Sequence, residues 1–241
     1  MNTTSRMDLK EVAFIGRTYS EYMDIFGLNE QALLNGPVLD CPAGASSFTA
    51  EAKKKGFDVT ACDILYDLPA AKLEAMGRQA LAIIEQKMEE TAHLFNWGYY
   101  GDRKRHMGHR AGAFELFMAD YPAGRTSGRY ICAALPRLPF KDRSFELVLS
   151  SHFLFLYGDR FSPMFHAGSL KEMARVCRNE VRVYPLLGLN AKPYPHMQQV
   201  LDMARRDGMR AEIRATRFEF FKGADKLLIL NPAKYNAGEK E

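Results

Sequence analysis

Two carboxylates and one glycine in this chain have the spacing of a nucleoside-binding unit. Asp40 ends the apolar run "VLD", and Gly44 follows in a short turn. Asp63 lies at the end of a second apolar run, "FDVTACDI", 19 residues beyond Gly44. A carboxylate about 20 residues beyond such a turn accepts hydrogen bonds from ribose hydroxyls. The spacing therefore predicts a nucleoside site. Alternatively, Asp63 only caps the helix that follows in "DLPAAK".

The turn after Asp40 suits a ligand that has no phosphate. It reads "CPAGAS", with a single glycine, and Pro42 has no backbone N–H to donate. A pyrophosphate needs a glycine-rich turn at a free helix N-terminus, and a P-loop needs a Lys that this turn lacks. S-adenosylmethionine (SAM) has the same ribose as NAD but carries a sulfonium cation in place of the pyrophosphate. The turn therefore fits a ligand such as SAM better than a pyrophosphate, and an NAD(P) oxidoreductase is the least favoured enzyme class.

Alternating strand and helix patterns predict the elements that position these residues. Strand patterns end near Asp40 and Asp63 and then cover "YICAAL", "SFELVLSS" and "EVRVYPLL". Helical patterns cover 48–55, 69–95, 163–178 and 196–208, and "RAEIRATRFEFF" with "DKLLIL" predicts a closing hairpin. The predicted fold is α/β, a Rossmann-like open sheet, mostly parallel with a C-terminal antiparallel hairpin and helices on both faces. Its ligand is expected at the carboxyl ends of the strands.

The chain is predicted to form a single domain over residues 1–241. Residues 1–35 form an N-terminal helical segment, and about 96–128 form an insertion or cap that is partly helical near "AFELFMADY". The insertion interleaves aromatic and basic residues in "NWGYYGDRKRHMGHR". Such a segment can bind RNA, form a lid over an anionic substrate, or be an exposed charged loop.

Three stretches resemble the class I SAM-dependent methyltransferases of the small-molecule type. "VLDCPAGASSF" resembles the first motif, "LPRLPFKDRSFELVLSSH" the Leu-Pro-Phe segment before the fourth strand, and "LKEMARVCRNEVRVYPLL" the helix and fifth strand. The chain departs from the family pattern at Pro42 and Ser46, which replace two motif glycines. It also lacks an acidic residue after the third strand and the Pro-Gly-Gly before the fifth.

The resemblance implies which residues contact the cofactor. Asp40 would lie near the SAM ammonium, Asp63 at the ribose, and the backbone of Ala134 and Leu135 beside the adenine, while Arg17 would bind a carboxylate of SAM or of the substrate. The full set of expected cofactor contacts is Arg17, Tyr19, Asp40, Cys41, Pro42, Ala43, Gly44, Asp63, Ile64, Ala134, Leu135, Ser150 and Ser151.

His152 follows the fourth strand and is the candidate catalytic residue. Its ordinary pKa near neutrality would suit a general base toward a protonated acceptor. Pocket lining and hydrogen-bonded scaffolding are the alternative roles. We expect a SAM-dependent methyltransferase, an enzyme, acting on an unidentified small molecule. The alternatives are a non-catalytic SAM-binding or protein-interaction module on the same fold, and an RNA methyltransferase that uses the basic insertion.

Composition limits the remaining classes. Of 241 residues, 47% are hydrophobic and 26% charged, as in a soluble globular protein. No apolar run approaches the roughly 20 residues of a membrane span, and the N-terminus has no apolar signal core. The four cysteines lie at no metal-ligand spacing, so we expect a cytoplasmic protein without a metal. The net charge of +4 is too small to predict a nucleic-acid partner, and the oligomeric state is not predicted.

Overall fold

A computed structural model describes residues 6, 7, 9 and 11–232 of the chain. Most of the N-terminus that was examined for an export signal therefore lies outside the described residues, as does the C-terminal end of the predicted 1–241 domain. No helix in the described part of the chain has the length and apolar character needed to cross a membrane.

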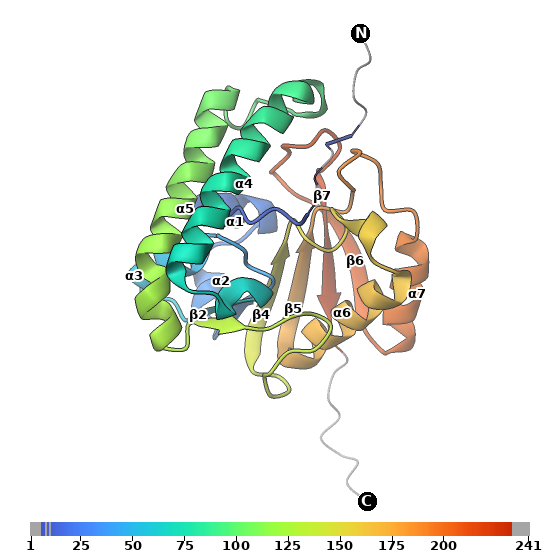
Figure 1. The fold of residues 1–241 in the computed structure, drawn as a ribbon. Coiled ribbons are helices and arrows are strands. Elements are labelled where there is room, and N and C mark those ends of the chain that lie inside the picture. Colours follow the sequence, from blue (N-terminus) through green and yellow to red (C-terminus); the bar gives the residue numbers. More distant parts are fainter. Residues whose placement is uncertain (1–5, 8, 10, 233–241) are drawn as a thin grey trace, which may run out of the picture.

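The centre of the molecule is one sheet of seven strands in the order β3-β2-β1-β4-β5-β7-β6 (Figure 1). β7 pairs antiparallel with β5 and β6, while every other neighbouring pair is parallel. The predicted fold class is confirmed. The strands are β1 (Val38–Asp40), β2 (Val59–Asp63), β3 (Tyr130–Cys132), β4 (Phe145–Ser151), β5 (Cys177–Tyr184), β6 (Arg210–Ala215) and β7 (Lys226–Asn231).

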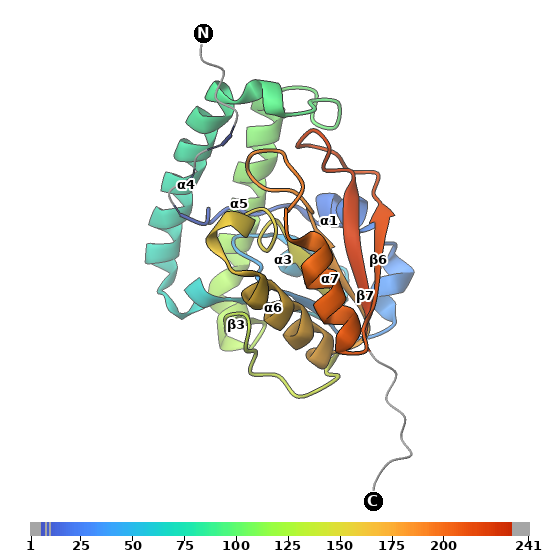
Figure 2. The same ribbon diagram turned by 90° about the vertical axis from the view of Figure 1, so that its right-hand side faces the viewer.

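Helices cover both faces of the sheet (Figures 1 and 2). α6 and α7 pack together against one face, and α1, α3 and α5 lie on the other. The helices are α1 (Tyr19–Phe26), α2 (Glu30–Leu34), α3 (Phe48–Lys54), α4 (Ala70–Glu90), α5 (Arg103–Thr126), α6 (Pro163–Val176) and α7 (Met197–Arg206). Short 3-10 turns span Ile64–Asp67, Ala92–Leu94 and Gly158–Arg160.

The helical part of the connection between β2 and β3 is longer than the sequence pattern predicted. Residues near "AFELFMADY" were expected to be helical only in part, but α5 is continuous from Arg103 to Thr126, and the side chain of Asp102 caps its N-terminus. The buried face of α5 includes the polar side chains of His106 and Arg110 besides aromatic residues. Those polar residues interrupt the apolar periodicity on which the prediction depended.

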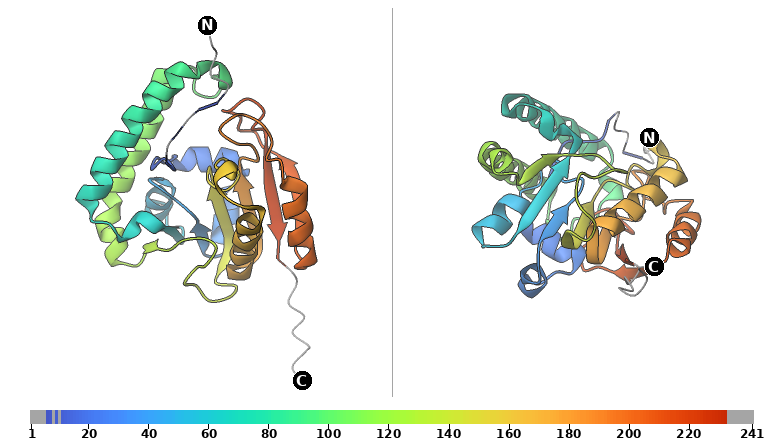
Figure 3. Two further views of the ribbon diagram at one scale, coloured as in Figure 1. Left: turned by 45° about the vertical axis from the view of Figure 1, so that its right-hand side comes forward. Right: turned by 90° about the horizontal axis from the view of Figure 1, so that it is seen from below.

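The two long helices α4 and α5 lie side by side as an antiparallel pair, with the N-terminal segment between them and the sheet (Figure 3). Gly77 of α4 permits their close approach, because a Cβ there would lie 2.1 Å from the Phe114 ring of α5. We expect Gly77→Ala to lower the free energy of unfolding by about 1–3 kcal/mol through overpacking. Urea denaturation measures this value.

Gly108→Ala is the matched control, since a Cβ at this position in α5 would meet no atom within 4 Å. It should stabilise the protein by up to about 1 kcal/mol, the difference in helix propensity between alanine and glycine. Equal stabilities for the two variants would show that the helix contact is not tight at Gly77.

Candidate functional site

A cavity of about 480 Å³ lies at the carboxyl ends of the parallel strands. This is the edge at which open α/β sheets bind their ligands. The segments that follow β1, β2, β3 and β4 all contribute to its wall, and the N-terminal segment and α4 close it from above. From the strand ends it is lined by Pro42, Ala43, Gly44, Asp63, Ile64, Leu65, Ala133, Ala134, Leu135, Ser151, His152 and Phe153.

The turn after β1 is held in place by the segment after β2. Gly44 has a φ of +55°, a conformation that L side chains rarely adopt. Its N–H donates to Oδ2 of Asp63 at 3.0 Å, and its carbonyl accepts from the Tyr66 hydroxyl at 2.7 Å. The glycine is therefore required by the geometry of the turn, which two hydrogen bonds fix beside the cavity.

Most backbone N–H groups of this turn are used within the protein. Pro42 has none to offer. Protein acceptors take the N–H groups of Cys41, Ala43, Gly44, Ser46, Ser47 and Phe48. A phosphate-binding turn directs such donors at its ligand instead. The turn is consequently a poor site for a pyrophosphate.

Asp63 both stabilises the backbone and lines the cavity. Its two carboxylate oxygens accept the N–H groups of Gly44 and Leu65, each at 3.0 Å, and it is the N-cap of the turn Ile64–Asp67. Burial raises the pKa of Asp63, and the two backbone N–H groups partly oppose that rise. A carboxylate has about four lone-pair sites, so it can still accept hydrogen bonds from a ligand. Asp63 therefore caps the turn and lines the cavity at the same time.

Asp40 does not lie at the cavity wall, in contrast to its expected position beside the ligand. It is fully buried, and both of its oxygens accept from the Tyr22 hydroxyl, at 2.9 and 3.0 Å. Burial raises the pKa of Asp40 well above its usual range. Tyr22 lines the cavity instead, so Asp40 reaches a ligand only through Tyr22. No pattern in the sequence indicated this contact between Tyr22 and Asp40.

Three further expected contacts are also absent from the cavity wall. The Tyr19 ring stacks on Phe48 and lies under the Lys55 ammonium, 5.3 Å from Nζ to the ring centroid. Cys41 is buried in a hydrophobic core cluster, and Ser150 is fully buried in β4, where successive residues alternate between the two faces of the sheet. The expected residues that do line the cavity are Arg17, Pro42, Ala43, Gly44, Asp63, Ile64, Ala134, Leu135, Ser151 and His152.

A buried ion pair that the sequence did not reveal lies next to the cavity. Glu21 and Arg110 are both fully buried and form a salt bridge, and the Tyr100 hydroxyl donates to the same carboxylate oxygen. The other oxygen accepts the backbone N–H of Thr18 at 2.8 Å. Burial alone would raise the pKa of Glu21, but Arg110 and Arg17 lower it to about 2. Glu21 is therefore ionised and carries most of the negative charge in this cluster.

Two basic side chains of this cluster line the cavity itself. Nε of Arg17 is buried and has no hydrogen-bond partner among the described residues. Burial and the nearby charge of Arg110 lower the pKa of Arg17. The same two causes lower the pKa of His106 to about 2, so this ring is neutral. The positive charge of this cluster therefore comes from guanidinium groups rather than from histidine.

His152 has an unusual backbone conformation, with a φ of +54°. Its N–H donates to the Tyr184 carbonyl at 2.6 Å, and its Nδ1 hydrogen-bonds Oγ of Ser151 at 2.8 Å. Burial, followed by Arg17 and Arg110, holds the pKa of His152 well below its usual range. A left-handed backbone at a non-glycine residue is a mark of functional sites. The neutral ring is suited to orienting a ligand and is a weak base.

Three comparisons relate the chain to known proteins. No protein-family model matches it. Among solved structures it is similar to the magnesium protoporphyrin IX methyltransferase of Synechocystis PCC 6803, crystallised with bound SAM, at 14% identity over 88% of this chain and 80% of that one, with a TM-score of 0.45. It is also similar to the PH0226 protein of Pyrococcus horikoshii OT3, at 14% identity over 94% and 93% of the two chains, with a TM-score of 0.46.

A stronger similarity is found among curated proteins. The uncharacterized protein MJ0045 of Methanocaldococcus jannaschii is 32% identical over 225 residues, which cover 93% of this chain and 98% of that protein. Identity at this level over nearly the full length of both chains places them in one family. The chain belongs to the family of MJ0045.

Proposed function

We propose that this protein is a SAM-dependent methyltransferase that acts on a small molecule. The main support is the turn after β1, which uses most of its N–H groups within the protein while Asp63 lines the cavity beside it. Such a site can accept a ribose but offers few donors to a pyrophosphate. The resemblance of the sequence to class I methyltransferases supports the same ligand.

The residues of the cavity wall fit the parts of SAM. Asp63 would accept hydrogen bonds from the ribose hydroxyls, and the backbone of Ala134 and Leu135 would lie along the adenine. Pro42 to Gly44 would support the methionine part. The free Nε of Arg17 would be left for the carboxylate of an acceptor. When bound, SAM supplies an electrophilic methyl group on a sulfonium cation.

The protein's own contribution to methyl transfer would be alignment and exclusion of water. Alignment of two reactants is worth several kcal/mol in a displacement of this kind. Beyond the strand ends the cavity wall is mainly apolar, which keeps solvent from the reacting groups. His152 lines the cavity just after β4, and we assign it the role of positioning the acceptor.

Titration calorimetry with S-adenosylhomocysteine (SAH), the demethylated product, tests the proposal. We expect saturable binding at one site per chain and no binding of NAD under the same conditions. Binding of NAD in preference to SAH would contradict the proposal.

The pH dependence of methyl transfer tests the role of His152. A histidine whose folded pKa lies well below the usual value stays unprotonated from about pH 6 to 8, so His152 should produce no step in rate over that interval. We expect His152→Asn to keep the shape of the pH profile and to lose less than about tenfold in kcat. Removal of a general base costs about 10²–10⁴-fold, so a loss of that size together with a vanished acidic limb would contradict the assignment.

Helix α5 gives little support to the alternative of an RNA substrate. His106 and Arg110 of the basic segment are buried rather than displayed. Arg103 pairs with Glu89 at 3.1 Å, and Arg105 lies 3.7 Å from Asp102. The segment thus has fewer free positive charges than its sequence suggests, and a small molecule is favoured.

A further inference from the structure

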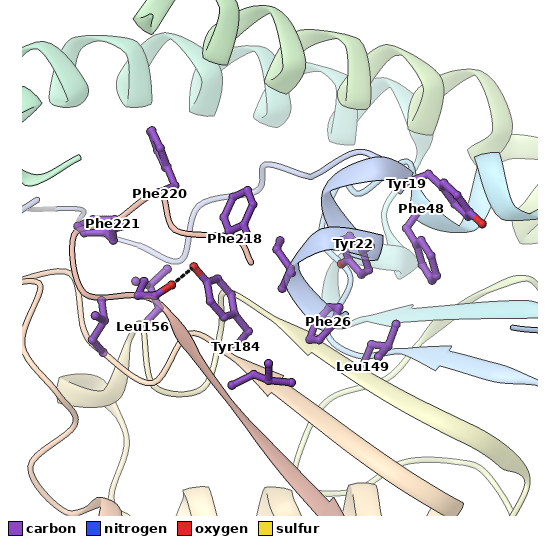
Figure 4. Packing of buried hydrophobic residues seen from close by; sticks show 14 of the residues in the cluster. Tyr19, Tyr22, Phe26, Phe48, Leu149, Leu156, Tyr184, Phe218, Phe220 and Phe221 are labelled. Carbon is purple, nitrogen blue, oxygen red and sulfur yellow. Dashed lines mark hydrogen bonds between the residues drawn. The ribbon is translucent and has the colours of Figure 1, made fainter. Parts of the chain in front are cut away.

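The part of the cavity beyond the strand ends is lined almost entirely by apolar side chains. They come from the N-terminal segment, from α4 and the segment after it, from the segment after β4 and the start of α6, from the loop after β5 and from the loop before β7. Figure 4 shows Phe220 of that loop extending toward the two long helices. The apolar lining consists of Met7, Leu9, Val12, Met76, Ile84, Met88, Phe95, Leu156, Phe161, Phe165, Leu189, Phe220 and Phe221.

A buried polar side chain, His106 of α5, lies within this apolar wall, and the exposed residue Glu11 also lines the cavity. His106 is 2% exposed, and its ring stacks on Phe220 with centroids 4.4 Å apart and planes 14° apart. The Tyr100 ring meets it edge-on at 4.7 Å. Nδ1 of His106 is buried without a hydrogen-bond partner among the described residues. A buried polar atom normally has a partner, so this nitrogen is available to a ligand.

Positive charge surrounds this polar position. Arg110, one turn further along α5, is fully buried, and its Nε and Nη1 have no partner among the described residues. Arg17 lines the cavity and interacts electrostatically with both His106 and Arg110. Among the described residues, Glu21 is the carboxylate that acts on both guanidinium groups. One carboxylate offsets one of their two positive charges, so a positive charge is left over. Bound SAM adds to it, because its sulfonium and ammonium outweigh its carboxylate.

We propose that the acceptor is an apolar molecule with a single carboxylate, whose charged end lies at His106 and Arg17 and whose apolar body lies between α4 and Phe220. The substrate class rests on the proposed function. A buried guanidinium with unused donors stabilises an anionic oxygen strongly, since charge-assisted hydrogen bonds are about twice as strong as neutral ones. The apolar wall would contact the rest of the ligand.

Calorimetry on the SAH-saturated protein tests the proposal with matched pairs of probes. Decanoate and decanamide represent an aliphatic body, and 2-naphthoate and 2-naphthamide an aromatic one. We expect the better-fitting acid to bind at least about tenfold more tightly than its amide, a difference of about 1.4 kcal/mol. Equal or tighter binding of both amides, or no binding of either acid, would overturn the proposal.

Variants locate the recognition site. His106→Phe keeps an aromatic ring against Phe220 but removes the nitrogens, and it should cut the preference for the acid by at least about fivefold. Arg105→Gln changes an exposed arginine of the same helix and should leave that preference unchanged. An unchanged preference in a folded His106→Phe variant, with unfolding temperature as the check, would remove His106 from the site.

The same titrations separate this inference from the proposed function. SAH binding is measured first, and acid binding is then measured with and without SAH. A protein that prefers acids but does not bind SAH would refute the methyltransferase proposal and retain the acidic ligand. A protein that binds SAH but shows no preference for acids would refute the acidic ligand and retain the methyltransferase proposal.

Discussion

Replacement of Glu21 by glutamine will destabilise the fold by about 3–5 kcal/mol, the usual cost of removing one partner of a buried ion pair. The carboxylate of Glu21 is fully buried and accepts from Arg110, Tyr100 and Thr18. The amide removes the negative charge and leaves the Arg110 guanidinium buried beside Arg17 without compensation. Two uncompensated guanidinium groups in a region of low dielectric constant repel each other and cannot be solvated.

Urea denaturation of Glu21→Gln and of a surface control measures this effect. The control variant is Glu74→Gln. Glu74 and Arg78 form an exposed ion pair one turn apart in α4, at 2.8 Å, so its loss should lower the free energy of unfolding by less than about 1 kcal/mol. Adding Arg110→Met to Glu21→Gln should restore part of the lost stability, because it removes the stranded charge. A free energy of unfolding for Glu21→Gln within about 1 kcal/mol of the wild-type value would show that Glu21 does not compensate the charge of Arg110.

Asp63→Ala will weaken SAH binding by at least about 100-fold, a free-energy loss of about 2.7 kcal/mol. The variant loses an acceptor for the ribose hydroxyls and also leaves the N–H groups of Gly44 and Leu65 without partners. An unpaired buried N–H costs about 1–3 kcal/mol, so the turn after β1 will relax away from its ligand-binding shape. Both effects act in the same direction on affinity.

Titration calorimetry of SAH measures the loss, with Asp67→Ala as the control. Asp67 belongs to the same 3-10 turn, but its side chain is 82% exposed and lies 3.6 Å from Arg125, so its removal should change the affinity less than about twofold. Wild-type affinity in a folded Asp63→Ala protein would mean that the ribose lies elsewhere.

The sheet was predictable from the sequence because its central strands are apolar runs bounded by turn residues, while the exposed edge strand β6 was indicated by its alternating pattern. The position of Asp63 was predictable too, since the end of β2 must lie beside the end of β1 in a parallel sheet. Tyr22 was not predictable as the partner of Asp40, because its spacing in α1 is that of ordinary packing. Glu21 and Arg110 are 89 residues apart, and nothing in a single sequence indicates that two such charges meet in the interior.

The position of His106 shows the same limit. In sequence it belongs to a basic stretch that is typical of an exposed loop or an RNA-binding segment. In the structure, α5 brings its ring into an aromatic cluster with Phe220, a residue 114 positions further along the chain. Long-range contacts of this kind determine which charges are buried, and local patterns do not contain that information.

The most direct test of the central claim is a crystal structure of the protein grown with saturating SAH. The adenosyl part should lie at the carboxyl edge of the sheet, with the ribose hydroxyls within hydrogen-bonding distance of Asp63 and the adenine along Ala134 and Leu135. SAH bound at another place, or a cavity that contains only solvent at saturating SAH, would contradict the assignment of this edge as a SAM site.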